Sequence, residues 1–267
     1  MKQRTIARPF HLAGPGLHSG QESRLLISPA PDNSGIVFLK DGARVPAVVA
    51  QVKDTKRGTS LNGIAVTEHL LSAVYGLGLD NLLVEVKGTE LPALDGSALP
   101  YAEALLNAGI ADQAADKQFL TTQQPIHLTS GDASLSAFPY RGFRVDFVVD
   151  FPGVGEQHFS FDLQQGNFTK EIAPARTFGY VEEYELLKQQ GLARGASLEN
   201  ALVLGKDGYI NQPRFPDEPV RHKILDLLGD LCLLGRPLQA EIKGVRSGHK
   251  LNIELARRIM EHDRARH

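Results

Sequence analysis

The stretch PVRHKILDLLGDLCLL, residues 219–234, decides how the rest of the chain is organised. Its apolar residues recur at helical spacing, which predicts one apolar helix face: Val220, Ile224, Leu227, Leu228, Leu231 and Leu234. Asp217 and Glu218 precede Pro219, and carboxylates followed by proline are typical of a helix start. The stretch is therefore predicted to form a long helix that packs against the core.

A polar stripe runs along the same predicted helix. His222, Asp226 and Asp230 are spaced four residues apart, so they would be neighbours on its surface. An imidazole and a carboxylate at this spacing are able to share one metal ion. A polar stripe beside an apolar one is also typical of a solvated face, and this stretch alone leaves both interpretations open.

A second stretch, residues 67–76, repeats the pattern, with Thr67 as a candidate helix cap. His69 precedes Gly76 by seven residues, as His222 precedes Gly229. The same three features follow both helices: a β-like run (81–86 and 238–242), a glycine-containing loop (95–97 and 247–249) and a closing helix (99–110 and 251–264). The chain is therefore predicted to contain two copies of one unit, each with a histidine at the same point.

The composition is that of an ordinary globular protein. The 267 residues are 42% hydrophobic and 22% charged. A net charge of −2 argues against a general nucleic-acid binder, and the single cysteine, Cys232, excludes a disulfide framework. No apolar run approaches the ~20 residues of a membrane span, and the N-terminus lacks a signal-peptide core. We expect a cytoplasmic protein with no integral membrane segment, no nucleic-acid partner and no evident obligate protein partner.

The first unit opens with β-rich sequence, including runs at residues 24–28 and 35–39. Residues 14–20 form a glycine-rich turn, which is either a tight loop between strands or a loop whose backbone approaches a ligand. This turn lacks the P-loop lysine and the dinucleotide fingerprint. Residues 111–117 are polar and rich in alanine, so we place a domain boundary there and expect units at 1–115 and 116–267.

The second unit contains a β run at residues 119–122 and a longer one at 143–151, which alternates as a half-buried strand should. Residues 170–179 have no clear periodicity and are expected to form a loop. A helix at 182–190 and a strand at 201–204 form an insertion, at about 180–204, that the duplicated plan lacks. The predicted fold class is α+β, built from two similar units of a β-sheet and two helices.

Two histidines and an aspartate, His69, His222 and Asp226, would supply three ligands and leave one position open, as in catalytic zinc sites. Glu68 adjoins His69, and neighbours on a helix point about 100° apart. Glu68 is therefore better placed beside a bound water molecule than as a fourth ligand. A carboxylate there could take a proton from water as it attacks a carbonyl group.

His249 occupies the loop that corresponds to residues 95–97 of the first unit, so it is expected to approach the same cleft. A charged imidazole there could stabilise an oxyanion or protonate a leaving amine, although an exposed loop histidine is the alternative. Asp230 could orient His249 or simply end the polar stripe. Lys223 has the position of a surface lysine. A serine or cysteine hydrolase is disfavoured, because there is no nucleophile elbow and Cys232 lies on an apolar helix.

Five motifs appear in order along the chain: TEHL (67–70), LDGS (94–97), ARTFG (175–179), VRHK with the following Asp226, Gly229 and Asp230 (220–230), and SGH (247–249). With them, from Gly16 onward, the chain resembles the UDP-3-O-acyl-N-acetylglucosamine deacetylases of Gram-negative bacteria, which catalyse the committed step of lipid A synthesis. The resemblance implies two β-sheet-plus-two-helix units packed as a β-α-α-β sandwich with the helices inside, and a small insertion in each unit.

The resemblance also implies roles for individual residues. It implies one catalytic Zn²⁺ on His69, His222 and Asp226, with Glu68 as general base. The other catalytic positions are Thr177 as a donor to the oxyanion, His249 as the charged acid, Asp230 as its holder and Lys223 in the site wall. The implied substrate-binding positions are Leu17, Phe151, Phe178, Tyr184, Leu198, Ala201 and Arg246. Residues 180–204 would form the acyl passage, and Phe151 and Arg246 the uridine and diphosphate end.

The chain departs from the family pattern at two places outside the metal site. Ala133 stands where some relatives have a basic residue, and residues 53–62 are shorter than in some members. The leading expectation is zinc-dependent hydrolysis of the small-molecule substrate UDP-3-O-acyl-N-acetylglucosamine to UDP-3-O-acyl-glucosamine and acetate. Another metal-dependent amidase or esterase on the same scaffold is one alternative. The other, a non-catalytic nucleotide-sugar binding protein, predicts loss of the base or of a ligand.

Overall fold

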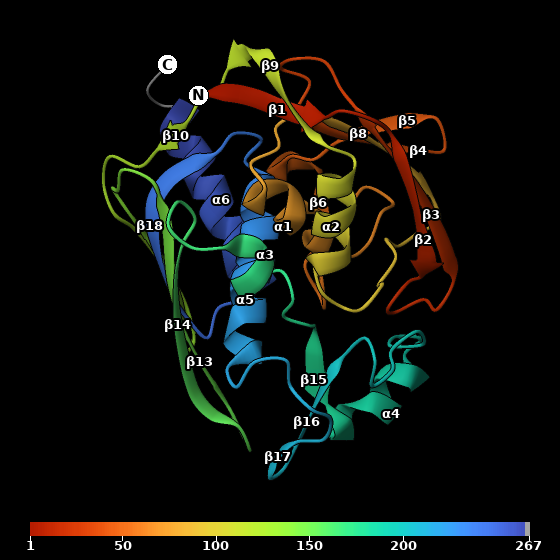
Figure 1. Cartoon of the computed structure of the whole chain (residues 1–267). Helices are drawn as coiled ribbons and strands as arrows, with labels where there is room; N and C mark the ends of the chain where they lie inside the picture. Colours follow the sequence, from red (N-terminus) through yellow and green to blue (C-terminus); the bar gives the residue numbers. More distant parts are fainter. Residues whose placement is uncertain (265–267) are drawn as a thin grey trace.

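Two large β-sheets form the outer layers of the protein, a computed structural model of which describes residues 1–264 (Figure 1). The first sheet has the order β2-β3-β8-β4-β5: β2 (Phe10–Pro15), β3 (Glu22–Pro29), β8 (Leu82–Lys87), β4 (Ile36–Lys40) and β5 (Ala43–Pro46). The second has the order β11-β12-β18-β13-β14, with β10 also paired to β18: β10 (Leu120–Thr121), β11 (Ile126–Ser130), β12 (Ala133–Phe138), β18 (Leu238–Val245), β13 (Phe143–Phe151) and β14 (Gly155–Asp162).

The two sheets repeat one pairing pattern. Along both five-strand orders the neighbours pair antiparallel, antiparallel, parallel and antiparallel. In each case the parallel pair includes the strand that follows one of the two facing helices: β8 follows the helix at residues 68–76, and β18 follows the helix at residues 218–232. A repeated unit produces such a pattern, and the α+β class predicted from the sequence is confirmed. The boundary between residues 115 and 116 stays a prediction.

Four helices lie between the sheets in Figure 1: α1 (Glu68–Gly76), α2 (Leu99–Asn107), α5 (Glu218–Cys232) and α6 (His249–Arg264). The buried apolar residues of both sheets and of these helices form one continuous core. Helices α1 and α5 approach each other closely at Gly229, where an added Cβ would lie 2.1 Å from the carbonyl oxygen of Glu68. Only glycine permits this approach, which brings the beginning of α1 against the C-terminal part of α5.

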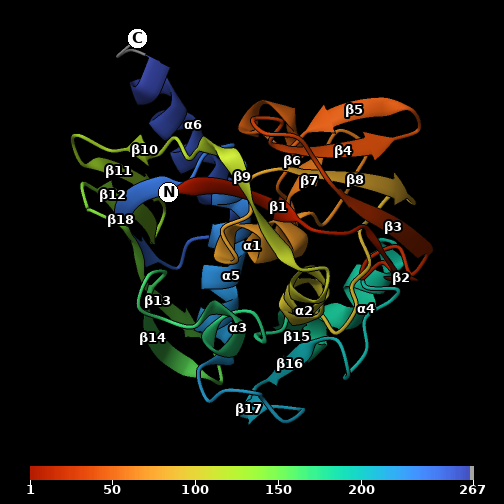
Figure 2. The same cartoon turned by 45° about the horizontal axis from the view of Figure 1, so that its top comes forward.

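Smaller elements lie at the two ends of the layers. Strands β1 (Lys2–Ile6) and β9 (Ile110–Asp116) form an antiparallel ribbon that runs from one large sheet to the other (Figure 2). The opposite end carries β15 (Phe178–Tyr180), α4 (Val181–Gln189), β16 (Leu202–Gly205) and β17 (Gly208–Tyr209) (Figure 1). The remaining elements are η1 (Val49–Gln51), β6 (Val52–Asp54), β7 (Ser60–Leu61) and α3 (Phe168–Glu171).

Several local predictions were wrong. No strand was expected at residues 111–117, but most of them belong to β9, whose partner β1 lies more than a hundred residues away in sequence. The hydroxyl of Thr67 does not cap α1; it donates to the carbonyl oxygen of Thr59. The expected loop at 170–179 begins in α3 and ends in β15, and His249 begins α6 instead of lying in a loop. The charged tail beyond residue 264 lies outside the described residues.

Within residues 1–264, no helix is both long enough and apolar enough to span a membrane.

Candidate active site

Three buried side chains from the facing helices α1 and α5 converge between the sheets. His69 comes from α1, and His222 and Asp226 come from successive turns of α5. One nitrogen or oxygen atom from each lies within 4.8 Å of the others. His222 Nε2 is 3.3 Å from Asp226 Oδ1, and the two imidazole rings meet edge to face. The spacing of four residues thus places a histidine and a carboxylate together, and the close approach of the helices adds the second histidine.

The protonation states of these groups suit a metal ligand set. Burial, together with the neighbouring His222, lowers the pKa of His69 to about 3, so its imidazole is neutral. Burial also lowers the pKa of His222. The Nδ1 of His222 lies 3.0 Å from the carbonyl oxygen of Ala175, which can only accept. Nδ1 therefore carries the hydrogen, and Nε2 presents its lone pair toward Asp226.

Asp226 remains ionised in this setting. Burial opposes its ionisation, but interactions with His222 and with the charged Lys223 outweigh burial and hold the pKa of the Asp226 carboxyl below its usual range. The Nζ of Lys223 donates to Asp226 Oδ2 over 2.6 Å and lies 5.8 Å from the centre of the Phe178 ring. Lys223 thus lies in the wall of the site, where the resemblance implied it, although its sequence context alone is that of a surface lysine.

Glu68, the first residue of α1, stands beside the three converging side chains. Its Oε2 accepts from the backbone N–H of Thr59 over 2.9 Å, and its Oε1 lies 4.0 Å from His249 Nε2. Burial raises the pKa of Glu68 to about 7, although the nearby charge of His249 lowers it. A carboxyl group with this pKa is suited to exchange a proton near neutral pH.

His249 is held by a buried carboxylate at the beginning of α6. Its Nδ1 donates to Asp230 Oδ2 over 2.8 Å, and Asn252 Nδ2 donates to the same oxygen over 2.9 Å. Burial alone would lower the pKa of His249, but the charges of Asp230 and Asp226 raise it to about 9. The imidazole is therefore positively charged at neutral pH, with Nε2 directed toward Glu68 and Asp226.

Thr59 is a site residue that the sequence did not reveal. Its hydroxyl donates to Asp230 Oδ1, while its backbone N–H donates to Glu68. It therefore contacts both the Glu68 and the His249 sides of the site. The neighbouring Gly58 has a φ of +144°, and a Cβ there would lie 2.9 Å from Glu68 Oε1. A lone threonine in a short irregular segment has no periodicity, so only this glycine could have drawn attention to it.

A cavity of about 740 Å³ opens above these groups. Its wall contains the three converging side chains, Glu68 and His249, together with nine further residues singled out from the sequence: Leu17, Phe151, Thr177, Phe178, Tyr184, Leu198, Ala201, Lys223 and Arg246. Asp230, fully buried and bonded to His249, is held behind the wall. The structure thus gathers every predicted site residue at one place.

The cavity lining combines two kinds of side chain. The insertion contributes residues such as Tyr184, Leu187 and Ala201, and Leu198 of the lining is exposed. Phe151 and Arg246 belong to the same lining. Arg246 donates to Asp132 Oδ2 over 2.7 Å and to Asp150 Oδ2 over 2.6 Å. Ala133, at the start of β12, is absent from the described lining, whose basic side chains include Arg57, Lys223 and Arg246.

Thr177 is placed by its backbone. Its N–H donates to the carbonyl oxygen of Gly96 over 2.8 Å, and its own carbonyl accepts from the N–H of Leu202 over 2.8 Å. Gly96 has a φ of +80°, and a Cβ there would lie 1.7 Å from the carbonyl oxygen of Asn200. The LDGS motif at residues 94–97 therefore contacts the site through its backbone, which the sequence alone did not indicate.

Comparison with known proteins agrees with this arrangement. The model of the UDP-3-O-acyl N-acetylglycosamine deacetylase family matches residues 3–261. Relatives named UDP-3-O-acyl-N-acetylglucosamine deacetylase include a Myxococcus xanthus protein, 44% identical over 97% of this chain and 86% of its own length. A Coxiella burnetii protein is 41% identical over 97% of this chain and 90% of its own length. A Saccharophagus degradans protein is 43% identical over 94% of this chain and 88% of its own length.

Both the family match and the relatives extend over nearly the whole chain, so the likeness includes both sheets, the four central helices and the cavity between them. The chain therefore belongs to the UDP-3-O-acyl N-acetylglycosamine deacetylase family.

Proposed function

We propose that the protein hydrolyses the N-acetyl group of UDP-3-O-acyl-N-acetylglucosamine, giving UDP-3-O-acyl-glucosamine and acetate, as the committed step of lipid A synthesis. The observation that carries the proposal is the convergence of His69, His222 and Asp226 beside Glu68 and His249 at the base of one cavity. The names of the relatives supply the substrate.

We propose zinc as the metal. The donor set consists of two neutral imidazoles and one carboxylate, a combination that catalytic zinc sites use. His222 already has the tautomer that a ligand needs, because Ala175 accepts its Nδ1 hydrogen. A zinc ion held by these residues would make water more acidic and polarise the acetyl carbonyl.

The protein's own groups would then move the protons. Glu68 takes a proton from the attacking water, and its pKa of about 7 makes it able to accept and release that proton. His249, charged because its pKa is raised to about 9, faces Glu68 from 4.0 Å and delivers a proton to the leaving amine. Asp230 holds the imidazole through Nδ1. Thr177 and Lys223, both in the cavity wall, are assigned to the oxyanion and its surroundings.

The lining of the cavity supports the division of the substrate into two parts. The insertion at residues 180–204 supplies apolar and aromatic side chains, which suit a 3-O-acyl chain. Phe151 and Phe178 pack edge to face with 4.9 Å between their ring centres, and Arg246 lines the same cavity. An aromatic group and a guanidinium suit a base and a diphosphate. We assign the uridine diphosphate to Phe151 and Arg246.

The proposed activity is tested by acetate release from UDP-3-O-acyl-N-acetylglucosamine. Metal-loaded protein should release acetate, a chelator should abolish release, and added zinc should restore it. His222→Ala protein should fold and bind much less zinc, because one of three ligands is removed. Absence of acetate from folded, zinc-loaded protein would refute the activity. Undiminished release after complete metal removal would refute the metal mechanism.

A substitution at Ala201 should change the acyl-chain preference. Ala201 is one of the insertion residues that line the cavity, and its small side chain leaves room there. Ala201→Leu is expected to reduce kcat/KM for long 3-O-acyl chains about tenfold more than for short ones, since overpacking a filled passage costs about 1–3 kcal/mol.

The matched control is Leu186→Ala. Leu186 lies on α4 of the same insertion, is 56% exposed and is absent from the described cavity lining. This variant should keep the wild-type ratio between long and short chains. An equal loss for all chain lengths in Ala201→Leu would show that Ala201 does not face the acyl group.

A further inference from the structure

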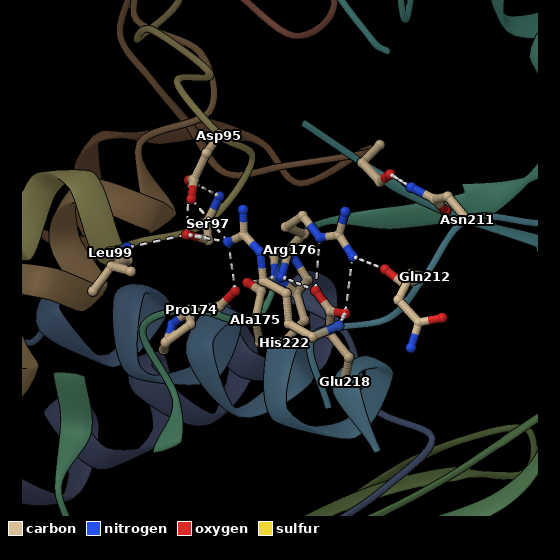
Figure 3. A network of polar contacts seen from close by, with 12 residues as sticks. Asp95, Ser97, Leu99, Pro174, Ala175, Arg176, Asn211, Gln212, Glu218 and His222 are labelled. Atoms are coloured by element: carbon tan, nitrogen blue, oxygen red, sulfur yellow. Dashed lines mark hydrogen bonds and ion pairs between the residues drawn. The ribbon is translucent and has the colours of Figure 1, made fainter. Parts of the chain in front are cut away.

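A buried ion pair lies just outside the cavity, at the first residue of α5. Glu218 is fully buried and Arg176 is 5% exposed. Neither side chain belongs to the described cavity lining, so neither touches the substrate. The guanidinium of Arg176 donates two hydrogen bonds to the carboxylate of Glu218, from Nε to Oε1 over 2.9 Å and from Nη2 to Oε2 over 3.2 Å (Figure 3).

The carboxylate of Glu218 also accepts hydrogen bonds from backbone N–H groups of two other segments. The N–H of Arg176 donates to Oε1 over 2.9 Å, and the N–H of Arg214 donates to Oε2 over 2.6 Å. Arg176 Nη2 in turn donates to the carbonyl oxygen of Gln212 over 2.9 Å. The pair therefore fastens the segments around residues 176 and 212–214 to the first turn of α5. Neutralising one partner of such a buried pair strongly lowers the free energy of unfolding, because the other charge is left buried without its partner.

Arg176 stands between two residues that face the active site. Its predecessor, Ala175, supplies the carbonyl oxygen that accepts from Nδ1 of His222, as Figure 3 shows. Its successor, Thr177, lines the cavity. Glu218 is one helical turn before His222 on α5. The segment at residues 175–177 is thus joined to α5 at two points, by the ion pair at Glu218 and by the hydrogen bond from His222.

The same network reaches the first unit of the chain. Arg214 Nη1 donates to Asp95 Oδ2 and to the carbonyl oxygen of Pro174, both over 2.8 Å. Asp95 accepts from the hydroxyl of Ser97 over 2.7 Å. Through Asp95, the LDGS motif therefore holds the segment that contains Ala175 and Thr177. This structural role explains the presence of a motif that supplies no catalytic side chain.

We propose that Arg176 and Glu218 are positioning residues: they hold the Ala175 carbonyl against Nδ1 of His222 and so keep the imidazole in the tautomer whose Nε2 is free for a metal. The assignment of a metal to His222 rests on the proposed function, but the tautomer itself does not. Losing the outer partner of a metal-ligating histidine typically weakens metal binding about 10–100-fold.

The test uses Glu218→Gln, which keeps the size of the side chain and removes its charge. Nitrogen NMR of the imidazole in metal-free protein, assigned by comparison with His222→Ala, reports which ring nitrogen carries the hydrogen. Wild-type His222 should carry its hydrogen on Nδ1, and the variant should show a mixture of the Nδ1–H and Nε2–H tautomers. Competition with a chelator should show zinc binding about 10–100-fold weaker in the variant. Arg176→Lys should have the same two effects, because an ammonium group cannot make the bidentate contact.

The matched control is Asp80→Asn, which breaks another buried ion pair, that of Asp80 with Lys117. Their side chains are 13% and 5% exposed, and Nζ lies 2.7 Å from Oδ2. This variant should lose stability to unfolding while keeping the wild-type tautomer and zinc affinity. The comparison separates a general loss of stability from a change at His222.

A wild-type tautomer and wild-type zinc affinity in folded Glu218→Gln protein would overturn the proposal. If that variant does not fold, the same two outcomes are read in Arg176→Lys and in the double variant Arg176→Met/Glu218→Leu, which removes both charges together. Neither readout needs substrate. Protein that binds zinc through His222 yet releases no acetate would refute the proposed function and leave this inference standing.

Discussion

Glu68→Gln protein is expected to keep its zinc and to lose about 10²–10⁴-fold in kcat, the usual contribution of a general base. Glutamine has the shape of glutamate, and its amide oxygen can still accept from the N–H of Thr59. It cannot take a proton from water. Because His69, His222 and Asp226 form a convergent set without Glu68, metal content should be unaffected.

The measurement is kcat on UDP-3-O-acyl-N-acetylglucosamine together with zinc content and thermal unfolding of the same preparation. Glu241→Gln is the control, because Glu241 pairs with Arg144 on the outer sheet and lies outside the described cavity lining. It should show a wild-type kcat. A Glu68→Gln protein with normal zinc and near-normal kcat would exclude Glu68 as the base, and loss of zinc would make Glu68 a ligand.

The three proposed metal ligands could be predicted from the sequence because their pattern is local and recurs along the chain. His222 and Asp226 are neighbours through helical spacing alone. His69 was added because residues 67–76 repeat the pattern of residues 219–234, with a histidine seven residues before a glycine in both stretches. The alternation of residues 143–151 was equally readable, since a strand with one buried face has a period of two.

The missed features depend on partners that are distant in sequence. Thr59 contacts Asp230 across 171 residues, and no local pattern encodes that meeting. Strand β9 is polar and rich in alanine, and only its pairing with β1 makes it a strand. The Arg176–Glu218 pair likewise joins a segment without periodicity to the start of a helix. Side-chain chemistry was thus easier to predict than the buried polar contacts that orient it.

The same contrast applies to His249. From its position in a glycine-containing loop matched to residues 95–97, His249 was predicted to approach the cleft, and it does line the cavity. The match did not extend to the details, because His249 is the first residue of a helix whereas Asp95 bonds to Arg214, away from the described lining. Its charge depends on Asp230, and that carboxylate reaches it only through the packing of α5 against α6.

His249→Gln protein is expected to lose about 10²-fold or more in kcat and to show a flattened or displaced alkaline limb, with normal zinc content. Burial would lower the pKa of His249, but Asp230 and Asp226 raise it to about 9. The imidazolium is therefore present below that pH and lost above it, so wild-type activity should fall as pH rises through about 9. Glutamine can donate a hydrogen bond but cannot deliver a proton to the leaving amine.

The acid limb should behave differently, because activity also requires ionised Glu68, whose pKa burial raises to about 7. Activity should therefore rise through about pH 7 in the wild type. In His249→Gln the rise should move to higher pH, because the charge of His249, which this variant lacks, lowers the pKa of Glu68 and so couples the two limbs. His158→Gln is the control: His158 bonds to Asp146 on the exposed face of β14 and should leave the whole profile unchanged. A wild-type alkaline limb at near wild-type rate in His249→Gln would show that another group protonates the amine, and Glu68 would then be the one side chain left to carry the proton from water to product.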